Sequence, residues 1–161
     1  MKQIEIKAAI ENLIDTFLYA GKVSIELRKK GLIKEIKEDN TPVSNGDLEV
    51  NRILTEKINN LTPQIPIVSE ETSHNKSKKD LKNFWLIDPI DGTYDYINDL
   101  DEFTLNAGLI INNRAVAGII YAPAKNRLFY SYEKGCSFEI INNKHVTVSY
   151  THLRAHETEQ H

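Results

Sequence analysis

The chain has little of what disulfide-bonded, membrane-spanning and nucleic-acid-binding proteins need. Among its 161 residues there is one cysteine, Cys136, so no disulfide can form within the chain. No apolar run approaches the length of a membrane span, and the N-terminus lacks the pattern of a secretion signal. The formal net charge of -3 provides no field that would hold a nucleic-acid polymer, although a small anionic ligand stays possible. We expect a soluble, cytoplasmic protein with no membrane span.

Two stretches have the apolar spacing of helices that pack against a core. The first has apolar residues three or four positions apart and a basic last turn that stops at Gly31. Its apolar residues are Ile6, Ile10, Leu13, Ile14, Phe17 and Leu18. Residues 38–47 contain several turn formers and predict a loop. A second helix is expected from about Asp47 to Asn60, with an inward side formed by Leu48, Ile53, Leu54 and Ile58.

Short apolar runs predict buried strands at 65–68 and 84–87, and acidic residues follow each run. From Phe103 onward, β-prone segments alternate with turn residues. These segments span 103–111, 115–122, 127–132 and 137–141. The chain is long enough to bury a core without disulfides. The order of elements predicts an α+β fold, in which two long helices pack on a largely antiparallel sheet.

The acidic residues that follow the apolar runs are candidates for a metal site. Three segments supply them, namely Asp47, the pair Glu70 and Glu71, and Asp88 with Asp91. Hard cations such as Mg²⁺ prefer oxygen ligands, several of them charged. Clustered carboxylates repel one another unless a cation neutralises them. If the three segments converge in space, the sequence predicts a magnesium site.

The segment Asp-Pro-Ile-Asp-Gly-Thr at 88–93 also has features of a phosphate site. Pro89 stiffens the backbone and leaves the carbonyl of Ile90 able to face a metal. Gly92 lets a phosphate approach the backbone, and Gly92 and Thr93 are expected to begin a short helix whose free N–H groups attract an anion. Cation ligands and anion donors in one turn favour metal-assisted hydrolysis of a phosphate ester.

Each of these segments also has a purely structural interpretation. Asp-Gly is a common turn, so residues 88–93 could be a turn and no more. Ser44 could be an N-cap with Asp47 as its capping-box partner, which is the favoured interpretation of Asp47 taken alone. Glu70 and Glu71 could form a solvated acidic loop or the first turn of a helix. The order of the three acidic segments along the chain shifts the balance toward function.

Three short motifs occur in a characteristic order. Residues 41–47, 68–72 and 85–93 read TPVSNGD, VSEET and WLIDPIDGT. Together they resemble the inositol monophosphatase superfamily of magnesium-dependent, lithium-sensitive phosphatases. DEFTLNAGLI at 101–110 and AGIIYAPAKNRLFYS at 117–131 are most similar to its CysQ-type 3'(2'),5'-bisphosphate nucleotidase branch. The resemblance implies a hydrolase that removes the 3'-phosphate of adenosine 3',5'-bisphosphate, giving AMP. An inositol or sugar monophosphatase, or a non-catalytic metal and phosphate binder, stays an alternative.

The resemblance also implies roles for individual residues. The implied ligands of two or three Mg²⁺ ions are Glu70, Asp88, Asp91 and the carbonyl of Ile90. The implied catalytic residues are Asp47, Thr93 and Glu70. Of these, Asp47 and Thr93 would orient or deprotonate the water that attacks phosphorus. The implied phosphate-binding residues are Gly92 and Thr93. Glu71 would be a neighbour outside the ligand shell, and the partner would be a small phosphorylated substrate.

The resemblance ends near Ser149. Residues 1–149 resemble the N-terminal domain of the superfamily fold, whereas nothing in the chain resembles its C-terminal α/β domain, which carries a further metal-binding aspartate. We therefore expect a truncated chain whose activity alone is open. Residues 150–161 have neither strand alternation nor an apolar stripe, and we expect a foreign or disordered tail. His152 and His156 have the spacing of a zinc pair, but a polar tail is the favoured interpretation.

Overall fold

The computed structural model describes residues 1–72, 80–142 and 144–149. Its helices are α1 (Gln3–Lys30), α2 (Asn45–Leu61), α3 (Thr93–Ile97) and the 3-10 turn η1 (Pro123–Lys125). Its strands are β1 (Lys34–Ile36), β2 (Pro42–Ser44), β3 (Ile67–Ser69), β4 (Phe84–Asp91), β5 (Thr104–Ile111), β6 (Arg114–Ala122), β7 (Arg127–Glu133), β8 (Cys136–Ile141) and β9 (Lys144–Ser149). The predicted tail, 150–161, lies outside the described residues.

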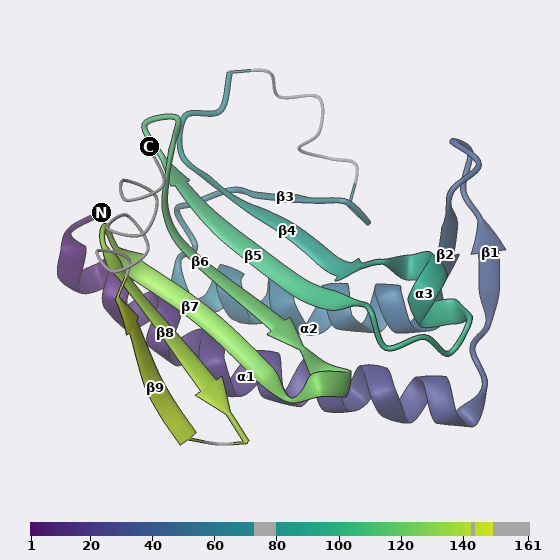
Figure 1. Ribbon diagram of the computed structural model, residues 1–161. Helices are drawn as coiled ribbons and strands as arrows, with labels where there is room; N and C mark the ends of the chain where they lie inside the picture. Colours follow the sequence, from purple (N-terminus) through teal and green to yellow (C-terminus); the bar gives the residue numbers. More distant parts are fainter. Residues whose placement is uncertain (73–79, 143, 150–161) are drawn as a thin grey trace, which may run out of the picture.

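Seven strands form one sheet in the order β3-β4-β5-β6-β7-β8-β9. β3 runs parallel to β4, and every following pair of neighbours is antiparallel. β1 and β2 form a separate antiparallel hairpin near α3, beyond one end of the sheet (Figure 1). The predicted α+β fold with a largely antiparallel sheet is confirmed, and β9 was not among the predicted strands.

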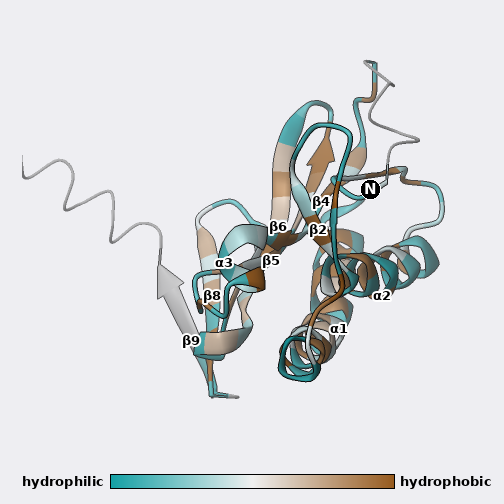
Figure 2. Ribbon diagram, turned by 90° about the vertical axis from the view of Figure 1, so that its right-hand side faces the viewer, coloured by the Kyte–Doolittle hydropathy of each residue, from teal (hydrophilic) through white to brown (hydrophobic). Residues whose placement is uncertain are grey.

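Helices α1 and α2 pack side by side along one face of the sheet (Figure 1), and the view from the side shows both on the same side of it (Figure 2). The core between helices and sheet contains Leu13 and Phe17 of α1, Leu54 of α2, and Trp85 and Ile87 of β4, each at most 1% exposed. The apolar stripes predicted for the two helices therefore include residues that are buried against the sheet. No helix in the described part of the chain is long and apolar enough to cross a membrane.

Side chains alternate along β4, so Leu86 and Asp88 point away from the helices. Leu86, Ile120 and Phe129 are exposed on this second face of the sheet. Together with Asp88 they line one shallow cavity. Asp88 is thus the site residue that lies next to the uncovered apolar face.

The prediction of a loop at 38–47 is wrong in part. Pro42–Ser44 form β2, antiparallel to β1, and α2 begins at the next residue. The turn formers act only at the tip of the hairpin, where a side-chain oxygen of Asp39 accepts hydrogen bonds from the N–H and the hydroxyl of Thr41. The turn-forming residues therefore indicate the hairpin turn correctly, but they do not predict the strand β2 that follows it.

The prediction that Leu48 faces inward is also wrong, because Leu48 is 49% exposed. The buried side of α2 runs through Val50, Leu54 and Ile58, which follow one another at helical spacing. Leu48 falls outside this stripe. The predicted burial of Ile53, Leu54 and Ile58 is confirmed.

Candidate active site

Asp47 lies in the first turn of α2 and is fully buried. Its Oδ2 accepts hydrogen bonds from the backbone N–H of Ser44 at 2.8 Å and from the Ser44 hydroxyl at 2.5 Å. The N–H of Asp47 donates in return to Ser44 Oγ at 3.3 Å. This reciprocal pair is a capping box, so the structural interpretation of Ser44 and Asp47 is confirmed.

Thr93, the first residue of α3, connects Asp47 with the end of β4. Its Oγ1 lies 2.9 Å from Asp47 Oδ1 and 3.1 Å from the carbonyl oxygen of Ile90. The hydroxyl has a single hydrogen for these two acceptors, so it can donate to only one at a time. Three predicted site residues, from α2, β4 and α3, thus meet at one hydroxyl group.

The backbone between β4 and α3 turns at Gly92. β4 does not end with its apolar run but continues through Pro89 to Asp91, and the predicted short helix follows at Thr93. Gly92 has a φ of 85°, and a Cβ at this position would lie 2.7 Å from the carbonyl oxygen of Glu102. Close backbone packing therefore already requires glycine here. Phosphate binding at Gly92 and Thr93 stays a prediction.

Glu70 follows the end of β3, and Asp88 lies next to it on the parallel strand β4. The N–H of Glu70 donates to the carbonyl oxygen of Ile87 at 3.1 Å. The pKa of Asp88 is raised to about 7, first by burial, then by a hydrogen bond with Glu70 and by the negative charges of Glu70, Asp91 and Glu71. Asp88 Oδ1 is buried and has no hydrogen-bond partner among the described residues. Such an oxygen is uncommon in folded proteins, and its surroundings favour a cation or a proton.

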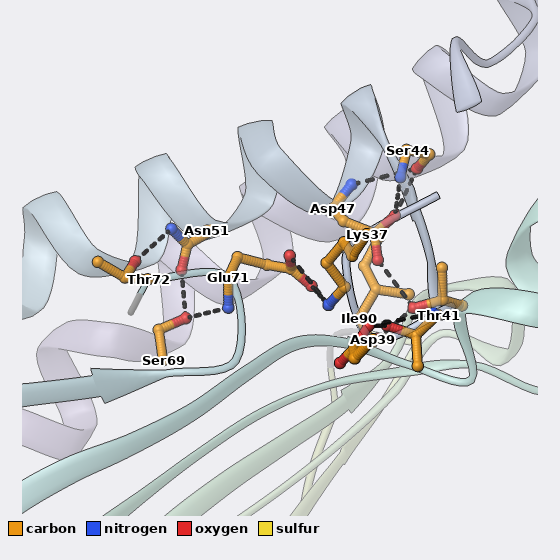
Figure 3. Close-up of polar contacts among 11 residues, drawn as sticks. Lys37, Asp39, Thr41, Ser44, Asp47, Asn51, Ser69, Glu71, Thr72 and Ile90 are labelled. Carbon is orange, nitrogen blue, oxygen red and sulfur yellow. Dashed lines mark hydrogen bonds and ion pairs between the residues drawn. The ribbon is translucent and has the colours of Figure 1, made fainter. Parts of the chain in front are cut away.

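Glu71 has a cationic partner, Lys37, that no motif in the sequence indicates. Lys37 Nζ, on the β1–β2 hairpin, lies 3.5 Å from both carboxylate oxygens of Glu71 (Figure 3). Burial raises the pKa of Glu71, Lys37 opposes this rise, and the charges of Asp47 and Glu70 add to it. Glu71 is thus neutralised from within the chain, which distinguishes it from Asp88.

Asn51 on α2 holds the turn that follows β3. Its amide group donates to the hydroxyl of Thr72 at 3.2 Å, and its carbonyl oxygen accepts from the hydroxyl of Ser69 at 2.5 Å. Ser69 Oγ accepts in turn from the N–H of Glu71 at 3.3 Å (Figure 3). Asn51 was not among the site residues predicted from the sequence. Its only sequence signal is its position four residues after Asp47, on the same side of the helix.

The predicted metal ligands, Glu70, Asp88, Asp91 and the carbonyl of Ile90, form an all-oxygen set of the kind that Mg²⁺ prefers. In the part of the chain that the structure describes, no three His, Cys, Asp or Glu side chains already lie in the arrangement of a metal site. The buried Oδ1 of Asp88 and the negative charges around it nevertheless fit a cation. The metal ligands therefore stay a prediction that the chemistry of the site favours.

Comparison with known families decides the affiliation of the chain. The inositol monophosphatase family matches residues 6–160. The chain belongs to this family. The resemblance carried by the three motifs is thereby confirmed, and the family is one of metal-dependent phosphatases. The boundary predicted at Ser149 stays a prediction.

Curated relatives bear the name of one branch of the family. The chain is 32% identical over 148 residues to the 3'(2'),5'-bisphosphate nucleotidase CysQ of Aggregatibacter actinomycetemcomitans, which covers 91% of this chain and 55% of that protein. It is 40% identical over 114 residues to the CysQ of Haemophilus influenzae, covering 70% and 42%. The chain thus spans about half the length of these relatives.

A solved structure agrees with the sequence relatives. The crystal structure of CysQ from Bacteroides thetaiotaomicron superposes with a TM-score of 0.62 at 25% identity. The superposition covers 92% of this chain and 55% of that one. The helices and sheet described above are therefore those of the inositol monophosphatase fold.

Proposed function

We propose that the chain is part of a magnesium-dependent phosphatase that removes the 3'-phosphate of adenosine 3',5'-bisphosphate, giving AMP and phosphate. The observation that carries the proposal is the buried Oδ1 of Asp88 in β4, which has no hydrogen-bond partner among the described residues and lies near three further carboxylates. The hydroxyl of Thr93, which contacts Asp47, follows β4 after the turn at Gly92. The CysQ names of the relatives support the nucleotide substrate.

Two or three Mg²⁺ ions would be held by Glu70, Asp88, Asp91 and the carbonyl oxygen of Ile90. When bound, Mg²⁺ supplies polarisation of a phosphoryl oxygen and a more acidic water. The carbonyl of Ile90 keeps a second lone pair for this purpose even while Thr93 donates to it.

Asp47 and Thr93 would manage the proton of the attacking water. Thr93 Oγ1 can accept that proton while its own hydrogen passes along the 2.9 Å contact to Asp47 Oδ1. The capping box fixes Asp47 through its other oxygen, so the carboxylate keeps its orientation during the transfer. The N–H groups at Gly92 and Thr93 would face the phosphate.

Phosphate release by residues 1–161 tests the proposal. The chain is supplied with Mg²⁺ and either adenosine 3',5'-bisphosphate or inositol 1-phosphate at equal concentration. Asp91→Asn should lower nucleotide turnover by at least about a hundredfold, because it removes a charged metal ligand. Asp95→Asn is the matched control, since Asp95 lies four residues further on and outside the proposed ligand set, and it should retain activity.

The outcomes separate the proposal from its alternatives. Unchanged turnover in Asp91→Asn would show that the site is wrongly assigned. Faster turnover of inositol 1-phosphate would favour an inositol monophosphatase. Saturable binding of Mg²⁺ and nucleotide in a calorimeter, without phosphate release, would identify the chain as a binding portion of the enzyme.

A further inference from the structure

Tyr96 is a fully buried tyrosine that joins two helices far apart in the sequence. It lies in α3, three residues after Thr93, and its hydroxyl donates to the carbonyl oxygen of Ser24 in α1 at 2.7 Å. Its ring also packs against that of Phe103, with centroids 4.9 Å apart. α3 therefore has an anchor on α1, a helix that supplies no residue to the proposed active site.

The ring of Tyr96 also fills the space beside the first turn of α2. A Cβ added to Gly46 would lie 2.2 Å from the Tyr96 hydroxyl oxygen and 2.7 Å from ring atom Cε1. Gly46 is thus required for the ring to approach, and the next residue is Asp47. Burial raises the pKa of Tyr96, and the charge of Asp47 adds to this rise. The hydroxyl therefore stays a donor to Ser24 over the physiological pH range.

Arg28 lies four residues after Ser24 and therefore on the same face of α1. It contacts the segment that follows α3. Its guanidinium donates to the carbonyl oxygen of Leu100 at 2.8 Å and to Asp101 at 2.9 Å. It also lies 5.1 Å from the ring centroid of Phe103. The last turns of α1 thus hold the segment that follows α3 as well as α3 itself.

We propose that Tyr96 is a positioning residue of the active site, which fixes the Thr93 hydroxyl against Asp47 by tying α3 to α1 and by filling the space beside Gly46. The inference rests on the proposed function. α3 has five residues, too few to be stable without tertiary contacts, so its anchor decides where Thr93 lies. A shift of Tyr96 is passed to Thr93 within one helical turn. The 2.9 Å contact between Thr93 and Asp47 is the distance that such a shift would lengthen.

Tyr96→Phe tests this role, since it removes the hydroxyl and keeps the ring. Tyr121→Phe is the matched control, because Tyr121 is 6% exposed and its hydroxyl contacts Asn126, which is not one of the proposed site residues. Tyr96→Phe should lower kcat about tenfold and leave KM within about twofold, as expected when a catalytic group is misplaced. Tyr121→Phe should change neither constant. Equal kcat values for the two variants, or a loss confined to KM, would overturn the inference.

Hydrogen exchange gives a second readout that needs no activity. The N–H groups of Ser44, Asn45 and Asp47 are all hydrogen-bonded, to Asp47 Oδ2, the carbonyl of Ile33 and Ser44 Oγ. Tyr96→Phe should accelerate their exchange about tenfold, whereas Tyr121→Phe should not. If the unmodified chain releases no phosphate, kcat cannot be compared between the variants, and exchange alone decides the inference. Unchanged exchange at 44–47 in Tyr96→Phe would then overturn it.

Discussion

Asp47 and Asp88 are carboxylates of one candidate site, but the protein satisfies them very differently. Asp47 is fully buried and accepts three hydrogen bonds, two from Ser44 and one from Thr93. Asp88 has an oxygen that is buried without a partner among the described residues, and its charged neighbours are Glu70, Asp91 and Glu71. The described residues therefore donate hydrogen bonds to both oxygens of Asp47 but none to Oδ1 of Asp88.

The difference assigns different tasks to the two residues. A carboxylate with both oxygens hydrogen-bonded holds its orientation, which suits a group that receives a proton from Thr93. A carboxylate that is surrounded by like charges gains most from a cation supplied from outside the chain. The comparison leads to four predictions, and the expected effects decrease from the first to the last.

Asp47→Ala should have the largest effect on stability. It removes the capping box of α2 and leaves the N–H and hydroxyl of Ser44 buried without their acceptor. We expect a loss of about 3 kcal/mol in the free energy of unfolding, measured by urea denaturation. Asp39→Ala is the control, because the exposed Asp39 also accepts two hydrogen bonds from one residue, Thr41. A loss as small as that of the control would show that Asp47 is not a structural residue.

Mg²⁺ should stabilise the protein through Asp88. At about a hundredfold excess over its dissociation constant, a ligand that binds only the folded state adds about 2.7 kcal/mol to the free energy of unfolding. Asp88→Asn should abolish most of this gain. Glu56→Gln, which neutralises an exposed carboxylate on α2, should keep it. Equal stabilisation of both variants by Mg²⁺ would remove Asp88 from the ligand set.

The metal-free protein should lose stability as the pH rises, because the folded pKa of Asp88 is raised. Folded Asp88 keeps its proton up to a pH of about 7, whereas the unfolded chain releases it near the usual pKa of 3.8. The folded state therefore binds more protons between these values, and stability falls as the pH rises from about 4 to about 7. Asp88→Asn should remove this slope and raise stability at pH 8 by about 1 kcal/mol, after allowance for solvent screening. An unchanged slope in thermal melts would contradict the raised pKa.

Much of the fold could be predicted because the spacing of apolar residues indicates which side of each helix or strand is buried. Phe17 and Leu54 each belong to a series of apolar residues at helical spacing, and these series are buried. The antiparallel strands from β5 onward are apolar segments separated by turn residues. Leu48 was misplaced because a single apolar residue at a helix start does not reveal which side of the helix it occupies. β2 was missed because its three residues stand between turn formers.

The candidate site could be predicted as a set of segments but not as a geometry. The motif order identified Asp47, Asp88 and Thr93, yet nothing in the sequence shows that Thr93 touches Asp47 across 46 positions. The contact of Lys37 with Glu71 spans 34 positions and carries no motif at all. Glu70 and Glu71 are adjacent and identical in type, so only the fold determines which of them receives the lysine.

Lys37→Met should have the smallest effect. It tests whether Glu71 is intermediate between Asp47, whose oxygens are both hydrogen-bonded, and Asp88, whose Oδ1 has no partner among the described residues. Glu71 has a side chain only 5% exposed, and the lysine is its cation. Removing Lys37 should raise the pKa of Glu71 further and lower stability at pH 8 by about 0.5 kcal/mol. At lower pH the loss should be smaller, because a protonated Glu71 no longer needs a cation. The double variant Lys37→Met with Glu71→Gln should recover the lost stability at pH 8, since it removes the unpaired charge together with its partner. If the double variant recovers no stability, the lysine acts through packing of its aliphatic stem, and Glu71 resembles Asp47 as a carboxylate satisfied without a cation.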